Sequence, residues 1–222
     1  MDENRSQPGD RCTRCGQCCL KSSPTLHRED APLLLNGPIQ KEHLLTIRQG
    51  EGITDHIHKD LSVADREMIK VKEKNGVGGG CIFFRDHDKA CSIYDWRPAQ
   101  CEAFDCRDTR EFTKVYEKPK LLRQDIVEDG ILAGLIEEHE ERCSYALLEG
   151  LIKKIPAQGE VALETLLDLL KFDYELRPFV SQKLSINPAE MDFYFGRPLI
   201  QTIVMYGLRV IREADGGFLL TT

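Results

Sequence analysis

The sequence predicts an α+β fold that is predominantly helical: a small cysteine-rich, metal-binding module with short strands, followed by a helical bundle. Three observations support this prediction. Eight of the nine cysteines lie between residues 12 and 106. Short apolar runs bounded by turn residues, typical of strands, occur in the same half. After about residue 112, apolar residues recur at helical spacing. We therefore expect a cysteine-rich module at residues 1–112 and a helical region at residues 113–222 packed on it.

Composition and charge narrow the class of protein. The chain has 222 residues and a formal net charge of −7, so it lacks the general basic character of a nucleic-acid-binding protein. No apolar run reaches the length of a membrane span, and the polar opening MDENRSQPGD does not resemble a secretory signal. We expect a cytoplasmic protein without a nucleic-acid or membrane partner. In a reducing compartment, clustered cysteines favour a metal over a disulfide framework.

The first half is expected to consist of short elements. Residues 12–19 are too rich in cysteine and glycine to predict a regular element, and residues 75–80 form a glycine-rich loop. The polar stretch at residues 85–89 is a turn between two strands. The remaining elements expected are a helix at residues 39–48, a strand at 67–72, strands at 81–84 and 91–94, and a helix from about 95 to 106.

The second half is expected to be helical throughout. One apolar face recurs from Leu122 to Ile155, and Pro156 closes it. Further helices are expected at residues 161–172, at 187–190, where Asn and Pro suit a helix start, and at 198–211.

The eight cysteines form two groups. The first is a C-x-x-C-x-x-C-C run, and the second is spread over 26 positions in the hairpin and the helix that follow. Thiolates at two-residue gaps can converge on one soft cation. The predicted metal ligands are Cys12, Cys15, Cys18, Cys19, Cys81, Cys91, Cys101 and Cys106.

The number of thiols allows two kinds of centre. Eight thiolates fill two four-cysteine zinc sites, whereas a 4Fe–4S iron–sulfur cluster takes four. Adjacent side chains diverge in a strand or a helix, so we expect Cys18 and Cys19 to serve two neighbouring sites, or one site and a free thiol. Such sites carry negative charge, and seven basic residues lie close by in sequence. They are Arg11, Arg14, Lys21, Arg85, Arg97, Arg107 and Arg110.

Other candidate ligands have simpler interpretations. Cys143 lies on the apolar face of a helix and is expected to be a small buried hydrophobe. The pair His56 and His58 and the single His87 are expected in loops or on the surface. The chain shows no Ser-His-Asp arrangement and no clear pair of acid–base carboxylates.

The cysteine pattern resembles that of a known family. The run Cys12–Cys19, the later four cysteines, Ile93-Tyr94 and Arg97-Pro98 are similar to the CxxCxxCC family of zinc- or iron-chelating domains. Members are mostly small bacterial proteins, and a related cysteine module occurs in flagellin lysine-N-methylases. The resemblance covers about the first half of the chain and implies metal chelation by the eight cysteines.

Two functions are compatible with these observations. The first is a metal-binding protein that holds an iron–sulfur cluster or zinc through the eight cysteines, with a redox role or an accessory role in protein modification. The alternative is a non-catalytic, zinc-stabilised protein-interaction module. Both predict another protein as the partner, and neither identifies an enzymatic activity or catalytic residues.

Overall fold

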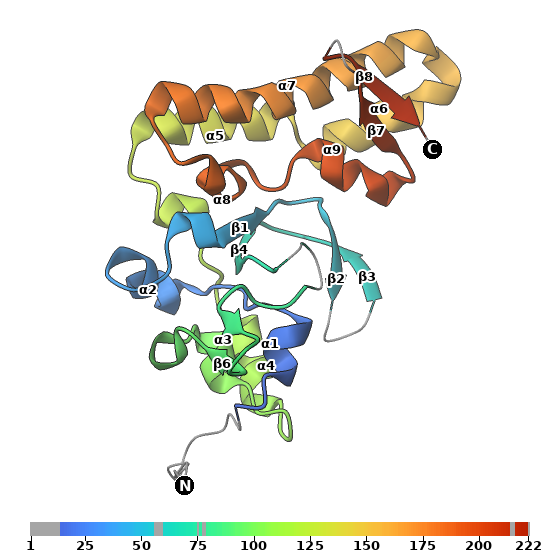
Figure 1. Ribbon diagram of the computed structural model, residues 1–222. Coiled ribbons are helices and arrows are strands. Elements are labelled where there is room, and N and C mark those ends of the chain that lie inside the picture. The colour runs from blue at the N-terminus through green and yellow to red at the C-terminus, as the bar shows by residue number, and fades with distance from the viewer. Residues whose placement is uncertain (1–13, 56–59, 75, 77–78, 214–215, 222) are drawn as a thin grey trace, which may run out of the picture. The chain divides into compact units, whose positions relative to one another are not determined.

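The computed structural model describes residues 14–55, 60–74, 76, 79–213 and 216–221 (Figure 1). Contacts between Cα atoms divide the chain into two compact units, and each unit combines two separate stretches of sequence. Unit 1 contains Met1–Leu44 and Met68–Asp125, and unit 2 contains Leu45–Glu67 and Ile126–Thr222. The predominantly helical α+β class is confirmed.

Unit 1 is built from short elements. Its longest helix has eight residues, and the strands of its hairpin have two each. In chain order, the elements are α1 (Gln17–Lys21), α2 (Ala31–Leu35), β4 (Met68–Val71), β5 (Phe84–Arg85), β6 (Ala90–Cys91), α3 (Ala99–Ala103) and α4 (Arg110–Glu117). Single 3-10 turns lie at Arg28–Asp30, Lys41–His43, Tyr94–Trp96 and Arg123–Asp125.

Backbone hydrogen bonds to β4 organise this unit. The N–H of Leu26 donates to the carbonyl of Ile69 over 2.8 Å, and the N–H of Val71 donates to the carbonyl of Pro24 over 3.0 Å. The carbonyl of Leu26 in turn accepts from the N–H of Leu121. The segment just after the first cysteine group is thereby fixed between two later parts of the chain.

Most predicted elements of unit 1 are present, with shorter bounds. The strand at 67–72 is β4, and the helix expected to carry Cys101 is α3. The strands expected at 81–84 and 91–94 are shifted toward the turn between them, where β5 and β6 form an antiparallel hairpin in which Cys91 is the one cysteine. The prediction for residues 39–48 is wrong, because a 3-10 turn there leads into β1 (Leu44–Ile47). In β1 the apolar side chains are buried in an extended chain, and β-branched Thr46 and Ile47 suit that conformation. The first cysteine group also contains a helix that was not expected, α1.

Unit 2 contains the longer helices. Helices α6 (Tyr145–Gln158) and α7 (Glu160–Leu184) pack along each other, and α5 (Gly130–Arg142) precedes them (Figure 1). The remaining elements are β2 (Gly52–Asp55), β3 (Asp60–Val63), α8 (Met191–Phe195), α9 (Leu199–Thr202), β7 (Arg209–Arg212) and β8 (Phe218–Thr221). The buried core of this unit consists of Cys143, Tyr145, Leu148, Leu151, Leu166, Leu169, Leu170, Leu199 and Ile203.

Several features of unit 2 differ from the sequence prediction. Pro156 was expected to close a helical face, but α6 continues past it to Gln158. Helix α7 extends to Leu184, well beyond residue 172. The helix expected at residues 198–211 is wrong, because α9 ends at Thr202 and a 3-10 turn ends at Gly207, whose φ is 75°. The chain then forms the antiparallel β7–β8 hairpin, which helical spacing of apolar residues did not predict.

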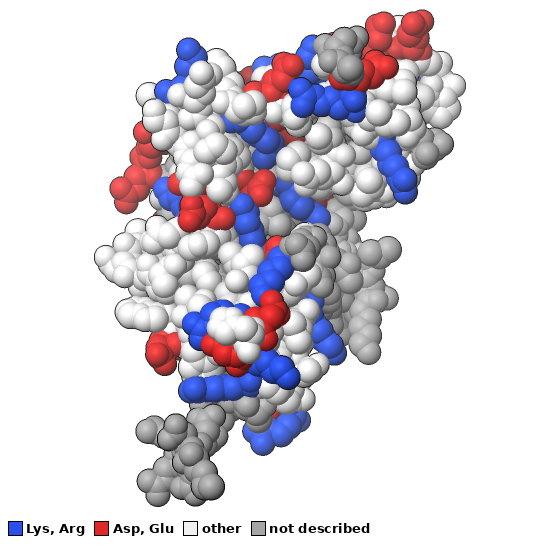
Figure 2. All heavy atoms as spheres, in the orientation of Figure 1, with Lys and Arg blue, Asp and Glu red and all other residues white. Residues whose placement is uncertain are grey.

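The helices of the described residues include none that is both long and apolar enough to cross a membrane. Figure 2 shows basic and acidic side chains interspersed on the visible face of the molecule.

Candidate metal centre

The first cysteine group is shaped by two residues with positive φ. Arg14 has φ 56° and Gly16 has φ 75°, which reverses the chain before α1 begins. Cys18 and Cys19 then lie within α1, and Cys15 is exposed just before it. Cys12 and Arg11 lie outside the described residues.

This group is docked against the start of the second one. The N–H of Cys81 donates a 2.7 Å hydrogen bond to the carbonyl of Cys19. Gly80, with φ 81°, lies so close that a Cβ on it would be 2.8 Å from the Cys19 oxygen. A Cβ on Gly16 would likewise lie 2.5 Å from the ring of Phe84. Cysteines more than 60 positions apart in the sequence are therefore brought together by close backbone contact.

Five thiols interact electrostatically, and we call Cys18, Cys19, Cys81, Cys91 and Cys101 the cysteine cluster. Burial, with a smaller contribution from Cys91, raises the pKa of Cys81 to about 11. The pKa of Cys101 is raised chiefly by burial of its thiol and then by Cys81, Cys18 and Cys91. A group of thiols that raise one another's pKa will lose protons together when a cation takes up their negative charge.

The adjacent cysteines are the tightest pair. The Sγ atoms of Cys18 and Cys19 lie 3.8 Å apart, and the contact with Cys19 lowers the pKa of Cys18 to about 6 while that of Cys19 is raised. Two sulfurs of a tetrahedral site with zinc–sulfur bonds of about 2.3 Å would also lie about 3.8 Å apart. This distance fits one tetrahedral ion, whereas the side-chain directions favour two sites, so which cysteines share an ion stays a prediction.

Another predicted ligand, Cys106, is exposed and lies beyond the end of α3. In the part of the chain that the structure describes, three donor atoms come within 4.8 Å of one another at His139, Cys143 and Asp173, and the sulfurs of the cysteine cluster are not gathered that tightly. The eight-cysteine ligand set therefore stays a prediction.

Two of the predicted basic neighbours hold the two cysteine groups together. The guanidinium carbons of Arg14 and Arg97 each lie 3.8 Å from the ring centroid of Tyr94. Arg14 belongs to the first cysteine group, whereas Tyr94 and Arg97 lie between Cys91 and Cys101. The positive charge of Arg97 also favours the thiolate of Cys101.

Three other basic residues close to the cysteines in sequence form ion pairs with aspartates. Arg85 pairs with Asp88, and the arginines after α3 pair with aspartates two positions earlier. These pairs are Arg107–Asp105 and Arg110–Asp108. Exposed pairs of this kind contribute little to stability, and their partners reduce the positive charge available to the cysteine cluster.

Hydrogen bonds from the Thr25–Asp30 region fix helix α3 and its Cys101. The two carboxylate oxygens of Asp30 accept from the N–H groups of His27 and Ala99, each over 2.8 Å. The side chain of Gln100 accepts from the N–H of Thr25 over 2.9 Å and lies 3.1 Å from His27 Nε2. Ala99 and Gln100, the two residues before Cys101, are thus hydrogen-bonded to the Thr25–Asp30 region.

Lowering the pH is expected to weaken the contact between the Thr25–Asp30 region and α3 through the buried His27. The residue is 1% exposed, and burial, with help from Lys120, lowers its pKa to about 4, although Glu29 opposes the shift. The ordinary pKa of histidine is about 6.5, so the unfolded chain binds a proton that the folded chain resists. Stability is therefore complete above about pH 6.5 and falls as the pH drops towards 4.

The test compares wild type with His27→Gln in denaturant unfolding at several pH values. Between pH 7 and pH 4, wild type should lose on the order of 2 kcal/mol more than the variant. Burial raises the pKa of the neighbouring Asp30, which has the opposite effect on stability but is present in both proteins. Equal losses in the two proteins would contradict the role of His27.

Of the histidines considered from sequence, the structure describes His87. His87 is exposed and lies 3.6 Å from a carboxylate oxygen of Asp88. His56 and His58 lie outside the described residues.

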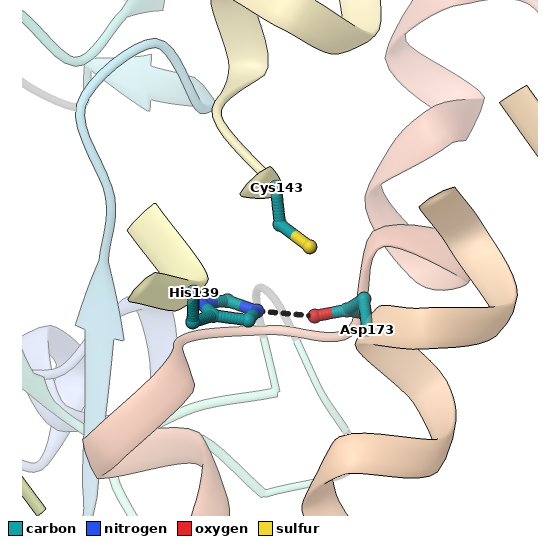
Figure 3. A group of neighbouring side chains, drawn as sticks. All are labelled: His139, Cys143 and Asp173. Carbon is teal, nitrogen blue, oxygen red and sulfur yellow. Dashed lines mark hydrogen bonds and ion pairs between the residues drawn. The ribbon is translucent and has the colours of Figure 1, made fainter. Parts of the chain in front are cut away.

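A second group of donor side chains occurs in unit 2. His139 and Cys143, at the end of α5, face Asp173 of α7, and Nε2 of His139 lies 2.7 Å from Oδ1 of Asp173 (Figure 3). Cys143 is fully buried, as expected for a hydrophobe, but its sulfur points toward this pair (Figure 3). The spacing His-x-x-x-Cys within a helical segment was the available signal, because residues four apart share a face.

Comparison with known proteins concerns the cysteine-rich part of the chain. Residues 11–120 match the family model described as "CxxCxxCC: Putative zinc- or iron-chelating domain". Neither the comparison with curated proteins nor that with solved structures found a match. The matched segment contains all eight predicted ligands, and the resemblance inferred from their spacing is confirmed. Over these 110 of its 222 residues, the chain is therefore similar to the CxxCxxCC family of zinc- or iron-chelating domains.

Proposed function

We propose that unit 1 is a zinc-binding domain in which cysteine thiolates hold the metal and the metal stabilises the fold. The observation that carries the proposal is the convergence of α1, the β5–β6 hairpin and α3, which places five thiols within electrostatic reach of one another. Thiolate donors suit zinc and iron–sulfur clusters, not hard cations such as magnesium or calcium.

The adjacent pair favours zinc over an iron–sulfur cluster. In a 4Fe–4S cluster bound by four cysteines, each thiolate ligates a different iron. Two sulfurs 3.8 Å apart fit the edge of one tetrahedral ion better. The thiols that act electrostatically on Cys19 are those of Cys18, Cys101 and Cys81, and we infer that these four cysteines hold one ion. The other predicted ligands, Cys12, Cys15, Cys91 and Cys106, would hold a further ion within unit 1.

Short elements support a structural role for the metal. Helices of five to eight residues and two-residue strands cannot bury much apolar surface by themselves. A metal that ties such elements together supplies folding free energy, because the unfolded chain has no preformed site. When bound, zinc would act as a cross-link. We infer a non-catalytic module that binds another protein.

In the alternative, the protein holds an iron–sulfur cluster and has a redox role. One experiment separates the zinc proposal from this alternative. The full-length protein is purified without oxygen, and iron, zinc and acid-labile sulfide are quantified together with a visible spectrum. The proposal expects colourless protein that contains zinc and no sulfide. Brown protein with stoichiometric iron and sulfide would establish the cluster instead, and metal-free protein with disulfide-linked cysteines would exclude both.

A further inference from the structure

Unit 2 contains a compact group of three different metal-ligating side chains. The N–H of Cys143 donates to the carbonyl of His139 over 2.8 Å, which continues the helical hydrogen-bonding pattern and places the two side chains on one face. Asp173 comes from the middle of α7. One donor atom from each residue lies within 4.8 Å of the other two, and all three residues are 0% exposed (Figure 3).

We propose that His139, Cys143 and Asp173 form a second, buried site for a divalent cation of the zinc class, separate from the cysteine cluster of unit 1. An imidazole nitrogen, a thiolate and a carboxylate oxygen are the three donor types that zinc accepts in proteins. The thiolate and imidazole disfavour magnesium and calcium, which require oxygen ligands. Burial keeps His139 neutral by lowering its pKa, so that a nitrogen lone pair is available to a metal.

Hydrogen bonds orient the carboxylate of Asp173, as a metal ligand requires. Its Oδ1 accepts from Arg177 over 3.1 Å as well as from His139, and its Oδ2 accepts from the N–H of Leu199 over 2.7 Å. A cation bound to Nε2 of His139 would replace the hydrogen bond between His139 and Asp173, and the imidazole proton would move to Nδ1, which has no hydrogen-bond partner among the described residues. The donors from Arg177 and Leu199 would remain and orient the carboxylate, as outer hydrogen bonds do at metal sites.

The charges around the group leave room for one further positive charge. Two buried arginines lie beside it, and three carboxylates face them. The pairs are Arg48 with Glu140 at 2.9 Å, and Arg177 with Asp173 at 3.1 Å and Asp192 at 3.9 Å. With a neutral imidazole and thiol, two guanidinium charges face three carboxylate charges, of which that of Asp192 is 39% exposed. A divalent ion that replaces the thiol proton adds one positive charge beside these carboxylates.

The exposed neighbour of Cys143 does not alter this balance. Arg142 favours the Cys143 thiolate electrostatically, but it pairs with Glu138 at 3.6 Å and is exposed to solvent. Solvent screens its effect on the buried group.

Complete burial indicates a structural ion. With all three ligands inaccessible to solvent, an ion enters during folding or through local opening of α5 and α7. Its binding free energy then adds to the stability of unit 2. A solvent-exposed position for a substrate is not provided by these three residues.

The test counts zinc ions per chain in the full-length protein by native mass spectrometry and elemental analysis. Cys143→Ala should contain one zinc fewer than wild type. Added zinc should raise the melting temperature of wild type more than that of Cys143→Ala. Cys143→Ser supplies a second variant of similar size, should the alanine variant fail to fold. Thr202→Val removes another buried polar group of unit 2, next to Tyr145, and should keep the wild-type zinc content.

The two sites fail in distinguishable ways. Loss of zinc from Cys143→Ala with retention of the metal bound by unit 1 supports the second site, and Cys101→Ala should show the reverse. Equal zinc content in wild type, Cys143→Ala and Cys143→Ser would overturn the proposal. The three side chains would then form only a hydrogen-bonded polar group.

Discussion

Replacing Cys101 with alanine should remove metal from unit 1. Cys101 is half-buried and its thiol interacts with those of Cys81, Cys18 and Cys91, so its loss opens the centre of the cysteine cluster. Changes to groups that only support a metal ligand commonly lower affinity 10–100-fold. Loss of a ligand should therefore raise the dissociation constant for zinc more than about 100-fold. That change corresponds to about 2.7 kcal/mol of binding free energy.

Competition with a chromophoric zinc chelator measures this effect. The control is Ser92→Ala, which lies in the same segment and loses a 3.1 Å hydrogen bond to the carbonyl of Phe83 but no metal donor. Its affinity should stay within a few-fold of wild type. Wild-type affinity in Cys101→Ala would exclude this cysteine from the ligand set.

The second large effect is expected at Gly80. An alanine there would meet the backbone of the first cysteine group, with its Cβ 2.8 Å from the carbonyl oxygen of Cys19 and 3.0 Å from Cα of Leu20. Backbone atoms cannot rotate aside, so α1 must move away from the second cysteine group. The same movement stretches the hydrogen bond from Cys81 to Cys19. We expect at least a tenfold loss of zinc affinity and a lower melting temperature.

Gly76 provides a matched control for backbone strain. Its φ is 90°, close to the 81° of Gly80, but no atom lies within 4 Å of a Cβ built on it. Gly76→Ala should therefore show only the cost of a positive φ, about 1–2 kcal/mol. Gly80→Ala should show this cost and a further 1–3 kcal/mol from overpacking. Equal stability and metal affinity in the two variants would contradict the docking of the cysteine groups.

The sequence predicted the local parts of the metal centre well. The spacing of the cysteines, the hairpin between Cys81 and Cys91 and the helix that carries Cys101 all follow from short-range patterns. Contacts between distant residues were not predictable in this way. The approach of Cys19 to Cys81 depends on Gly80, and the sandwich of Arg14, Tyr94 and Arg97 joins residues 80 positions apart.

The incorrect element predictions have a common physical cause. Residues 39–48 and 198–211 contain apolar residues at spacings that fit a helix. The first segment is divided between a 3-10 turn and a strand, and the second between the short helix α9, a 3-10 turn and a strand. Short apolar runs do not distinguish a helix from a buried strand, and tertiary packing decides between them. Gly207, with φ 75°, marks the end of the 3-10 turn after α9. Cys143 is buried as expected, but its proximity to Asp173, 30 positions away, could not be predicted from short-range patterns.

The central claim is that cysteine sulfurs of unit 1 hold the metal. X-ray absorption at the metal edge tests it most directly, measured on Cys143→Ala so that the proposed second site does not contribute. The account predicts a bound metal whose nearest neighbours are all sulfur, at about 2.3 Å for zinc. A shell of nitrogen and oxygen, or protein that binds no metal, would contradict it.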